Sequence, residues 1–265
     1  MAPDDKSWQV PAFEVSELRA KATRYCVGIP VINEGERIRG QLARMHALGL
    51  PAQADLIIAD GGSTDGSTAL EALAACGVRA LLVKTGPGRL SAQLRMFFAY
   101  ALRQGYEGFV TVDGNGKDGI DAIPRFLEAL EQGWDYVQGS RYIPGGMERN
   151  TPLARKLGVR LLHAPLLSVA SGFRYTDTTN GFRAFSRKLV EDERLQLFRD
   201  VFDAYNLHYY VSLKTPKLGY RVKELPVSRV YPEAGPVPSK IKGVSGAARV
   251  MLELVKTVGG AFDPK

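Results

Sequence analysis

The sequence predicts an α/β protein with a mostly parallel, doubly wound central sheet flanked by helices. Short apolar runs rich in branched residues, typical of buried strands, alternate along residues 25–138 with stretches whose apolar residues recur at helical spacing. Polar segments follow several of these runs, at the strand ends where ligands bind in parallel sheets. The expected strands are Tyr25–Val31, Leu56–Asp60, Val78–Val83, Gly108–Val112 and Asp135–Gln138.

Helices between these strands are expected from apolar spacing and from start and stop signals. Gly49 and Pro51 end the first helix, and Asp65 is placed to cap the second. The last of these helices runs to the region of Gln132. The apolar sets that define the first three are Ile38, Leu42, Met45 and Leu48, then Leu70 and Leu73, then Leu94, Phe97, Phe98 and Leu102.

The composition is that of a basic globular protein: 265 residues with a net charge of +7, 45% hydrophobic and 24% charged. The charge suggests phosphorylated ligands, an acidic membrane surface or nucleic acid as partners. Nucleic acid is not expected, because no basic-aromatic stripe follows a single element. Two unclustered cysteines, a polar N-terminus and the lack of an apolar run of about 20 residues favour a cytoplasmic protein, with peripheral contact to the inner face of the membrane left open.

The central motif is T-V-D-G-N-G-K-D-G, residues 111–119, directly after the fourth expected strand. Asp113 stands at the strand end, and two glycines make the following turns permissive. Asp113, Asn115 and Asp118 offer hard oxygen ligands of the kind that Mg²⁺ or Mn²⁺ accepts beside substrate phosphates. An Asp-Gly turn without chemistry is the alternative interpretation of these residues alone.

The C-terminal half contains a basic, leucine-rich helix that is expected to begin at Pro152. Its less polar part, residues 161–173, would be about 20 Å long, short of a hydrocarbon core of about 30 Å. The helix suits either a membrane surface or a core position with solvated basic residues. A late strand at Tyr220–Val227 and a closing helix from Lys240 onward are also expected.

Several ordered motifs together resemble the family 2 glycosyltransferases of the GT-A fold, and among them the dolichyl/polyprenyl-phosphate sugar transferases. The resemblance covers residues 24–245. Its motifs are V-G-I-P-V-I-N-E-G, A-D-G-G-S-T-D-G-S, G-P-G-R, T-V-D-G-N-G-K-D, Q-G-S-R-Y, D-T-T-N-G-F-R-A-F and the late R-V-Y. Neither a dinucleotide-binding G-x-G-x-x-G after the first strand nor a P-loop is present in the sequence.

The resemblance implies a Rossmann-like GT-A domain with a C-terminal acceptor-side extension. Residues 1–23 would be a lead-in, residues 24–140 the nucleotide-sugar-binding half and residues 141–265 the acceptor-side half with amphipathic helices. The implied reaction is an inverting transfer from a nucleotide-diphosphate sugar to a polyprenyl phosphate or other lipid-linked acceptor in glycan or cell-envelope synthesis.

The resemblance also implies a donor pocket. Asp60 matches the acid that contacts the base, although Gly61 stands where the family usually has a second acid, and Asp65 would contact base or ribose. Arg89 belongs to the basic glycine-rich loop. The positions matched to substrate binding on this side are Pro30, Asn33, Glu34, Asp60, Asp65 and Arg89.

The family's central D-x-D motif matches Asp113 and Asn115, which would hold the Mg²⁺ or Mn²⁺ that bridges the donor phosphates. Asn115 departs from this pattern and removes one negative charge, so metal affinity is expected to fall. Lys117 stands where relatives often carry a metal-binding amide, and its ammonium could partly replace the cation.

The remaining matches lie in the second half of the chain. Arg141 and Arg155 match residues that hold phosphates of donor or acceptor, since an arginine fork suits phosphate. Asp177 and Arg183 match the acceptor-side D-x-x-x-G-F-R segment. Asp113, Arg141 and Asp177 are the catalytic candidates; Asp177 would serve as the base if the acceptor is a hydroxyl. Arg229 and Lys240 match a mobile basic segment that can close over the diphosphate.

Two alternatives stay open from the sequence. One is a glycosyltransferase acting on a soluble sugar or polysaccharide hydroxyl. The other is a non-catalytic nucleotide-sugar-binding protein, made inert by Asn115 and Gly61.

Overall fold

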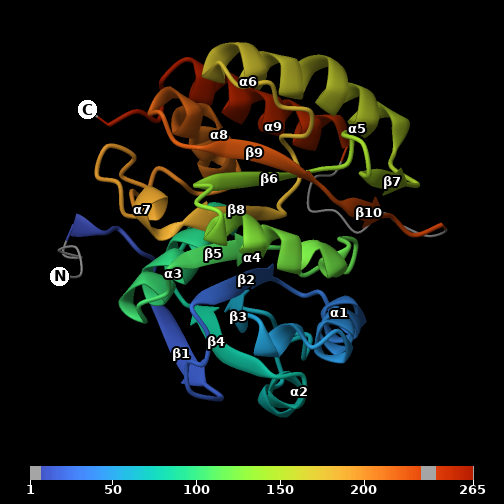
Figure 1. The fold of residues 1–265 in the computed structure, drawn as a ribbon, viewed down its shortest axis with the longest axis vertical. Helices are drawn as coiled ribbons and strands as arrows, with labels where there is room; N and C mark the ends of the chain where they lie inside the picture. Colours follow the sequence, from blue (N-terminus) through green and yellow to red (C-terminus); the bar gives the residue numbers. More distant parts are fainter. Residues whose placement is uncertain (1–6, 234–242, 265) are drawn as a thin grey trace.

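The computed structural model of the protein describes residues 7–233 and 243–264, and its centre is an eight-stranded, mostly parallel sheet (Figure 1). The first strand along the chain pairs antiparallel with its neighbour, and the strand at Arg183–Ser186 is antiparallel to both of its neighbours. The other adjacent pairs are parallel. Across the sheet the strands are β1 (Phe13–Glu17), β4 (Val78–Lys84), β3 (Asp55–Asp60), β2 (Tyr25–Val31), β5 (Gly108–Thr111), β8 (Arg183–Ser186), β6 (Tyr136–Ser140) and β9 (Val222–Pro226).

Helices cover both faces of this sheet. Successive strand residues point to opposite faces, so Cys26 and Phe109 belong to one apolar core while Val27 and Val110 belong to the other. The first core is covered by α3 (Leu90–Arg103), α6 (Ala164–Ser171), α8 (Asn206–Lys217) and α9 (Gly243–Val258), and the second by α1 (Glu36–Ala47), α2 (Leu70–Ala75) and α4 (Ile123–Glu131).

Between β6 and β8 the chain leaves the sheet as the 141–182 segment. α6 packs against α8 and α9, and Figure 1 shows α5 and α6 running beside α9 beyond β6 and β9. β10 (Ser228–Val230) pairs in parallel with a strand of this segment. The elements of the segment are β7 (Met147–Arg149), α5 (Leu153–Gly158), the π-helical turn η4 (Val159–His163) and α6.

Three short helical elements complete the described chain. They are η2 (Leu50–Ala52), η3 (Ile120–Ala122) and α7 (Arg187–Val190). Across residues 7–233 and 243–264, no helix combines the length and the apolar character needed to cross a membrane.

The expected α/β class and mostly parallel sheet are confirmed, and β2 has the bounds expected from the sequence. Two expectations were wrong. Residues 1–23 include the edge strand β1, whose backbone pairs with β4 although its side chains are mostly polar. Asp65 does not cap α2, because that helix begins at Leu70 after Ala69; the Asp65 carboxylate instead accepts hydrogen bonds from Ser67.

Candidate active site

The candidate site lies at the carboxyl edge of the sheet, where β5 runs into the glycine-rich loop that carries Asp113. A Cβ atom at Gly114 would lie 2.9 Å from the carbonyl oxygen of Pro30, at the end of β2. The N–H of Gly116, a residue with φ of +74°, donates to Oε1 of Gln41 at 2.9 Å. Both glycines are therefore needed to bring this loop against its neighbours and hold Asp113 at the strand end.

Arg229 reaches Asp113 from β10 and bridges it to a second carboxylate. Its Nη2 lies 2.9 Å from Asp113 Oδ2, and its Nη1 lies 2.5 Å from Oδ1 of the fully buried Asp118. Burial raises the pKa of Asp118. Burial, the largest single influence, acts in the same direction on Asp113, but the charge and hydrogen bond of Arg229 together with the charges of Lys117 and His208 outweigh it and leave the pKa of Asp113 lowered. Asp113 is therefore held as an ionised carboxylate.

Backbone hydrogen bonds hold Arg229 in this position. The N–H of Gly119 donates to the C=O of Ser228, and the N–H of Val230 donates to the C=O of Lys117, each at 2.9 Å. β10 thus joins the loop after β5 on one side and β7 on the other. Arg229, expected on a mobile basic segment, lies on this strand; Lys240 lies outside the described residues.

Lys117, Arg155 and Arg229 lie within 5.9 Å of the ring centroid of Tyr231, and together with Arg141, whose charge acts on the Tyr231 pKa, they form what we call the cationic cluster. The Lys117 ammonium lies 5.0 Å from the ring centroid. Arg155 donates from Nη1 to the Tyr231 hydroxyl at 3.1 Å. Burial raises the pKa of Tyr231, but the charges of Arg229, Arg155 and Arg141 outweigh it and lower the pKa overall. The cluster consists of Lys117, Arg141, Arg155 and Arg229.

Lys117 is the most compact charge of this cluster and is 6% exposed. Burial, helped by the positive charge of Arg229, lowers the pKa of Lys117 to about 8. An anion that enters the cluster would stabilise the protonated ammonium, because opposite charge favours the charged form. The arrangement suits a diphosphate.

The ligands expected to hold Mg²⁺ or Mn²⁺ are already engaged within the protein. Asp113 Oδ2 accepts from Arg229 and, at 3.2 Å, from Nδ2 of Asn115. Asn115 Oδ1 accepts from the backbone N–H of Lys117 at 3.3 Å. This donor set does not fit an open divalent-metal site.

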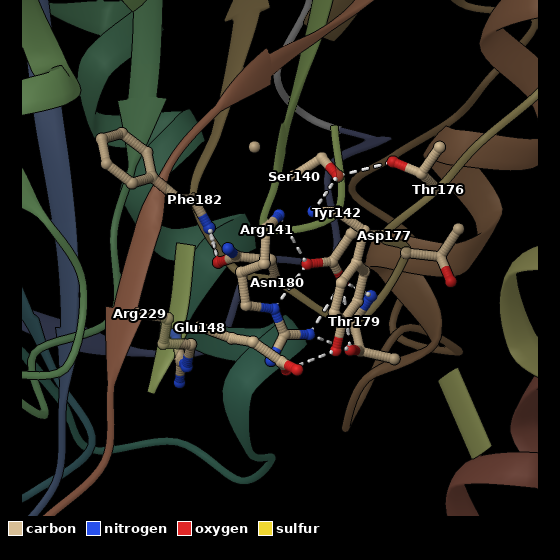
Figure 2. A network of polar contacts seen from close by, with 12 residues as sticks. Ser140, Arg141, Tyr142, Glu148, Thr176, Asp177, Thr179, Asn180, Phe182 and Arg229 are labelled. Atoms are coloured by element: carbon tan, nitrogen blue, oxygen red, sulfur yellow. Dashed lines mark hydrogen bonds and ion pairs between the residues drawn. The ribbon is translucent and has the colours of Figure 1, made fainter. Parts of the chain in front are cut away.

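Arg141, a member of the cationic cluster, forms a buried, two-pronged ion pair with Asp177 (Figure 2). Arg141 Nε lies 2.6 Å from Asp177 Oδ2, and Nη2 lies 2.9 Å from Oδ1. Thr179 adds a hydroxyl contact to the guanidinium, and Glu224 accepts the backbone N–H of Asp177. Burial alone would raise the pKa of Asp177. The charge and hydrogen bonds of Arg141 act more strongly together and lower the pKa of that carboxyl. The geometry is that of a carboxylate orienting an arginine.

Asp177 and Asp113 belong to one site, because the segment after Asp177 contacts Asp113. A Cβ atom at Gly181 would lie 2.4 Å from Asp113 Oδ1. The general-base role of Asp177 stays a prediction. Arg183 is fully buried, and its guanidinium donates to Thr178, Asn180, Tyr136, His208 and Ser212. Direct substrate contact by Arg183 also stays a prediction, and its observed contacts join this segment to β6 and α8.

The residues matched to the nucleotide pocket meet at the ends of β2 and β3. Asp60 accepts from the backbone and hydroxyl of Ser63, and that hydroxyl accepts from the N–H of Asn33 at 2.9 Å. Ser67 links Glu34 to Asp65 in the same way. Pro30 is the next-to-last residue of β2. The structure thus brings these five matched residues together, while their nucleotide contacts stay a prediction.

Arg89 lies apart from that network, exposed at the start of α3, where its backbone N–H donates to the C=O of Asp203. Two site residues were missed from the sequence. Tyr231 closes the R-V-Y motif, so the motif itself was the available signal. Glu224 accepts the backbone N–H of Asp177. It gave no local signal, because in the sequence it is one residue of an expected late strand.

Solved structures share this fold. Glucosyl-3-phosphoglycerate synthase from Mycobacterium tuberculosis, crystallised with Mn²⁺, UDP and glucosyl-3-phosphoglycerate, superposes with a TM-score of 0.64 at 16% identity, over 91% of this chain and 81% of that one. The sheet, its helices and this likeness define the GT-A fold.

Sequence comparison then gives the family. The model of glycosyl transferase family 2 matches residues 26–194, so the chain belongs to that family and is a glycosyltransferase. Polyprenol monophosphomannose synthase of Mycolicibacterium smegmatis is 30% identical over 83% of this chain and 82% of its own length. Undecaprenyl-phosphate mannosyltransferase of Micrococcus luteus is 29% identical over 81% of this chain and 86% of its own length. The resemblance to polyprenyl-phosphate sugar transferases is confirmed.

Proposed function

We propose that the protein moves a sugar, with inversion, from a nucleotide-diphosphate sugar to a polyprenyl phosphate or other lipid-linked acceptor. The observation that carries this proposal is that α5 contributes residues both to the cationic cluster and to an exposed apolar surface. It supplies Arg155 to the cationic cluster, and it exposes leucines to solvent on its other side. A phosphate at the cluster and its lipid chain at the leucines would be held by the same helix.

The exposed apolar residues form a surface over α5, η4 and α6, which we call the leucine surface. Their exposed fractions run from 46% at Leu157 to 86% at Val169. The surface consists of Leu153, Leu157, Leu161, Leu162 and Val169. Basic residues on the same helices favour an anionic bilayer, so we propose peripheral contact with the inner face of the membrane.

The proposed reaction needs cations at the leaving diphosphate, and it needs no general base when the acceptor is a phosphate. A nucleoside diphosphate leaves, so negative charge grows on its oxygens, and the cationic cluster stabilises that charge. A lipid phosphate is already ionised, so positioning is most of the task. The expected Mg²⁺ or Mn²⁺ at Asp113 and Asn115 stays a prediction that the donor set does not favour, although the Mycobacterium tuberculosis neighbour was crystallised with Mn²⁺.

The test is transfer from a panel of nucleotide sugars to polyprenyl phosphate in anionic liposomes, with the unphosphorylated polyprenol and soluble sugars as competing acceptors. We expect product only with the lipid phosphate. Product with a soluble sugar and none with the lipid would favour the hydroxyl-acceptor alternative and overturn the proposal.

Membrane contact has its own control. Leu161→Glu/Leu162→Glu should weaken liposome binding by roughly 100-fold, because two leucines leave the bilayer. Leu48→Glu, at a similarly exposed leucine at the end of α1, should leave it unchanged. Equal effects of the two changes would contradict the leucine surface.

A further inference from the structure

We infer that Arg229, together with Lys117, takes the place of a divalent cation in this enzyme, so that the donor diphosphate binds without metal. This inference rests on the proposed function. It concerns how the same site is charged, and the contacts of Asp113, Asp118 and Arg229 carry it.

The first step is the charge balance at the end of β5. Asp113 and Asp118 contribute two carboxylates, and Lys117 and Arg229 contribute two cations beside them. The guanidinium spans both carboxylates, as a bridging ion would. A divalent ion placed on Asp113 Oδ2 would have to share that oxygen with the Arg229 nitrogen, which lies 2.9 Å from it, and the two positive charges would repel each other at short range.

The second step is that Arg229 is anchored. Its strand is bonded on both sides of residue 229 to the loop that carries Asp118, through the 2.9 Å backbone hydrogen bonds of Ser228 and Val230. Asp118 Oδ2 has no hydrogen-bond partner in the described part of the chain, so the guanidinium is the group that neutralises this fully buried carboxylate. Removing Arg229 from the pair would leave Asp118 buried and uncompensated.

The third step is what a diphosphate would meet. Lys117 is held against Tyr231 by the cation–π contact, and Arg155 is bonded to the Tyr231 hydroxyl. The positive charge of Arg141, which Asp177 holds in place, also lowers the pKa of Tyr231. An ammonium and guanidinium groups are thus gathered before the ligand arrives, and preorganised charge of this kind binds phosphate oxygens without the cost of reorganisation.

The experiment measures nucleotide and metal binding separately. Calorimetric titration with UDP and with GDP is run in EDTA and in excess Mn²⁺, and Mn²⁺ binding is followed by electron paramagnetic resonance without nucleotide. We expect the better of the two nucleotides to bind the wild type with a Kd that differs less than about threefold between EDTA and Mn²⁺. Arg229→Met should weaken binding in EDTA by about tenfold or more and should gain Mn²⁺ affinity, because Asp113 and Asp118 lose their counter-ion.

Two further variants make the comparison decisive. Asp118→Asn/Arg229→Met removes the buried Asp118 carboxylate together with the Arg229 guanidinium that pairs with it. This double variant is used in place of Arg229→Met if Arg229→Met does not unfold cooperatively. Arg24→Met, in an exposed ion pair with Glu107, is the matched arginine control and should change neither titration.

The outcomes separate the two proposals. A wild-type Kd that rises threefold or more in EDTA, or a wild type that binds Mn²⁺ as tightly as the variant without Arg229, overturns the inference and leaves the proposed function intact. Failure of UDP and GDP to bind with or without Mn²⁺ refutes a UDP- or GDP-linked donor and the inference with it.

Discussion

The buried pair of Arg141 and Asp177 allows a sharp test of how the site is held together. Asp177→Asn removes the charge but keeps the shape, and it leaves the Arg141 guanidinium buried without its carboxylate. Losing one partner of a buried ion pair costs about 3–5 kcal/mol. A chain of this size loses roughly 2–4 °C of Tm per kcal/mol, so we expect a fall of roughly 6–20 °C.

The same pair sets a pH dependence of known sign. The pKa of Asp177 in the folded protein lies below its ordinary value of 3.8. The pair therefore contributes stability that is present above that ordinary value and is lost as the pH falls through the lowered pKa. Asp177→Asn should remove this part of the acid sensitivity, measured by thermal unfolding from pH 7 down to about pH 2.

Two control variants test whether the effect of Asp177→Asn comes from the buried ion pair. Glu107→Gln disrupts the exposed pair with Arg24, which solvent screens, so its Tm should stay close to that of the wild type. Arg141→Met/Asp177→Asn removes both charges and should regain part of the lost stability. A Tm for Asp177→Asn within 2 °C of the wild type would refute the view that this carboxylate compensates a buried arginine.

Three further predictions follow from single contacts. Tyr231→Phe loses the hydrogen bond to Arg155 but keeps the ring, so the KM for a lipid-phosphate acceptor should rise about 2- to 10-fold with little change in kcat; an unchanged KM would argue against Arg155 as an acceptor-side group. Gly114→Ala places a methyl group 2.9 Å from the Pro30 carbonyl and should cost about 1–3 kcal/mol in urea unfolding, unless the loop shifts, which a crystal structure would show. Asp113→Ala releases the guanidinium it holds and should lower kcat of transfer by about 100-fold or more; retained activity would remove Asp113 from the mechanism.

Much of the fold of residues 24–140 could be predicted from the sequence because its signals are local. β2 is a continuous apolar run, and α1 ends where Gly49 takes a left-handed conformation. α8 was missed because it is buried nearly all round and has no polar face to give a helical period. β8 was missed because it is only four residues long.

The sequence predicts which residues belong to the candidate site, but it does not predict which of them form ion pairs with one another. Asp113, Arg141, Asp177 and Arg229 each stand in a motif, so their presence was foreseeable. That Arg229 bridges Asp113 and Asp118 depends on the strand β10, whose position is set by contacts with residues more than a hundred positions away. Pairings between such distant segments leave no trace in the spacing of residues along one chain.

The antiparallel strand β8 lies between β5 and β6, and this reversal has a consequence for the rest of the molecule. Because β8 runs the other way, its start lies at the same edge as the end of β6. Residues 141–182 therefore leave the sheet at that edge and come back to it, with Arg141 at the departure and Gly181 at the return. A relative could exchange this whole length for another while β2, β3 and β5 kept their register.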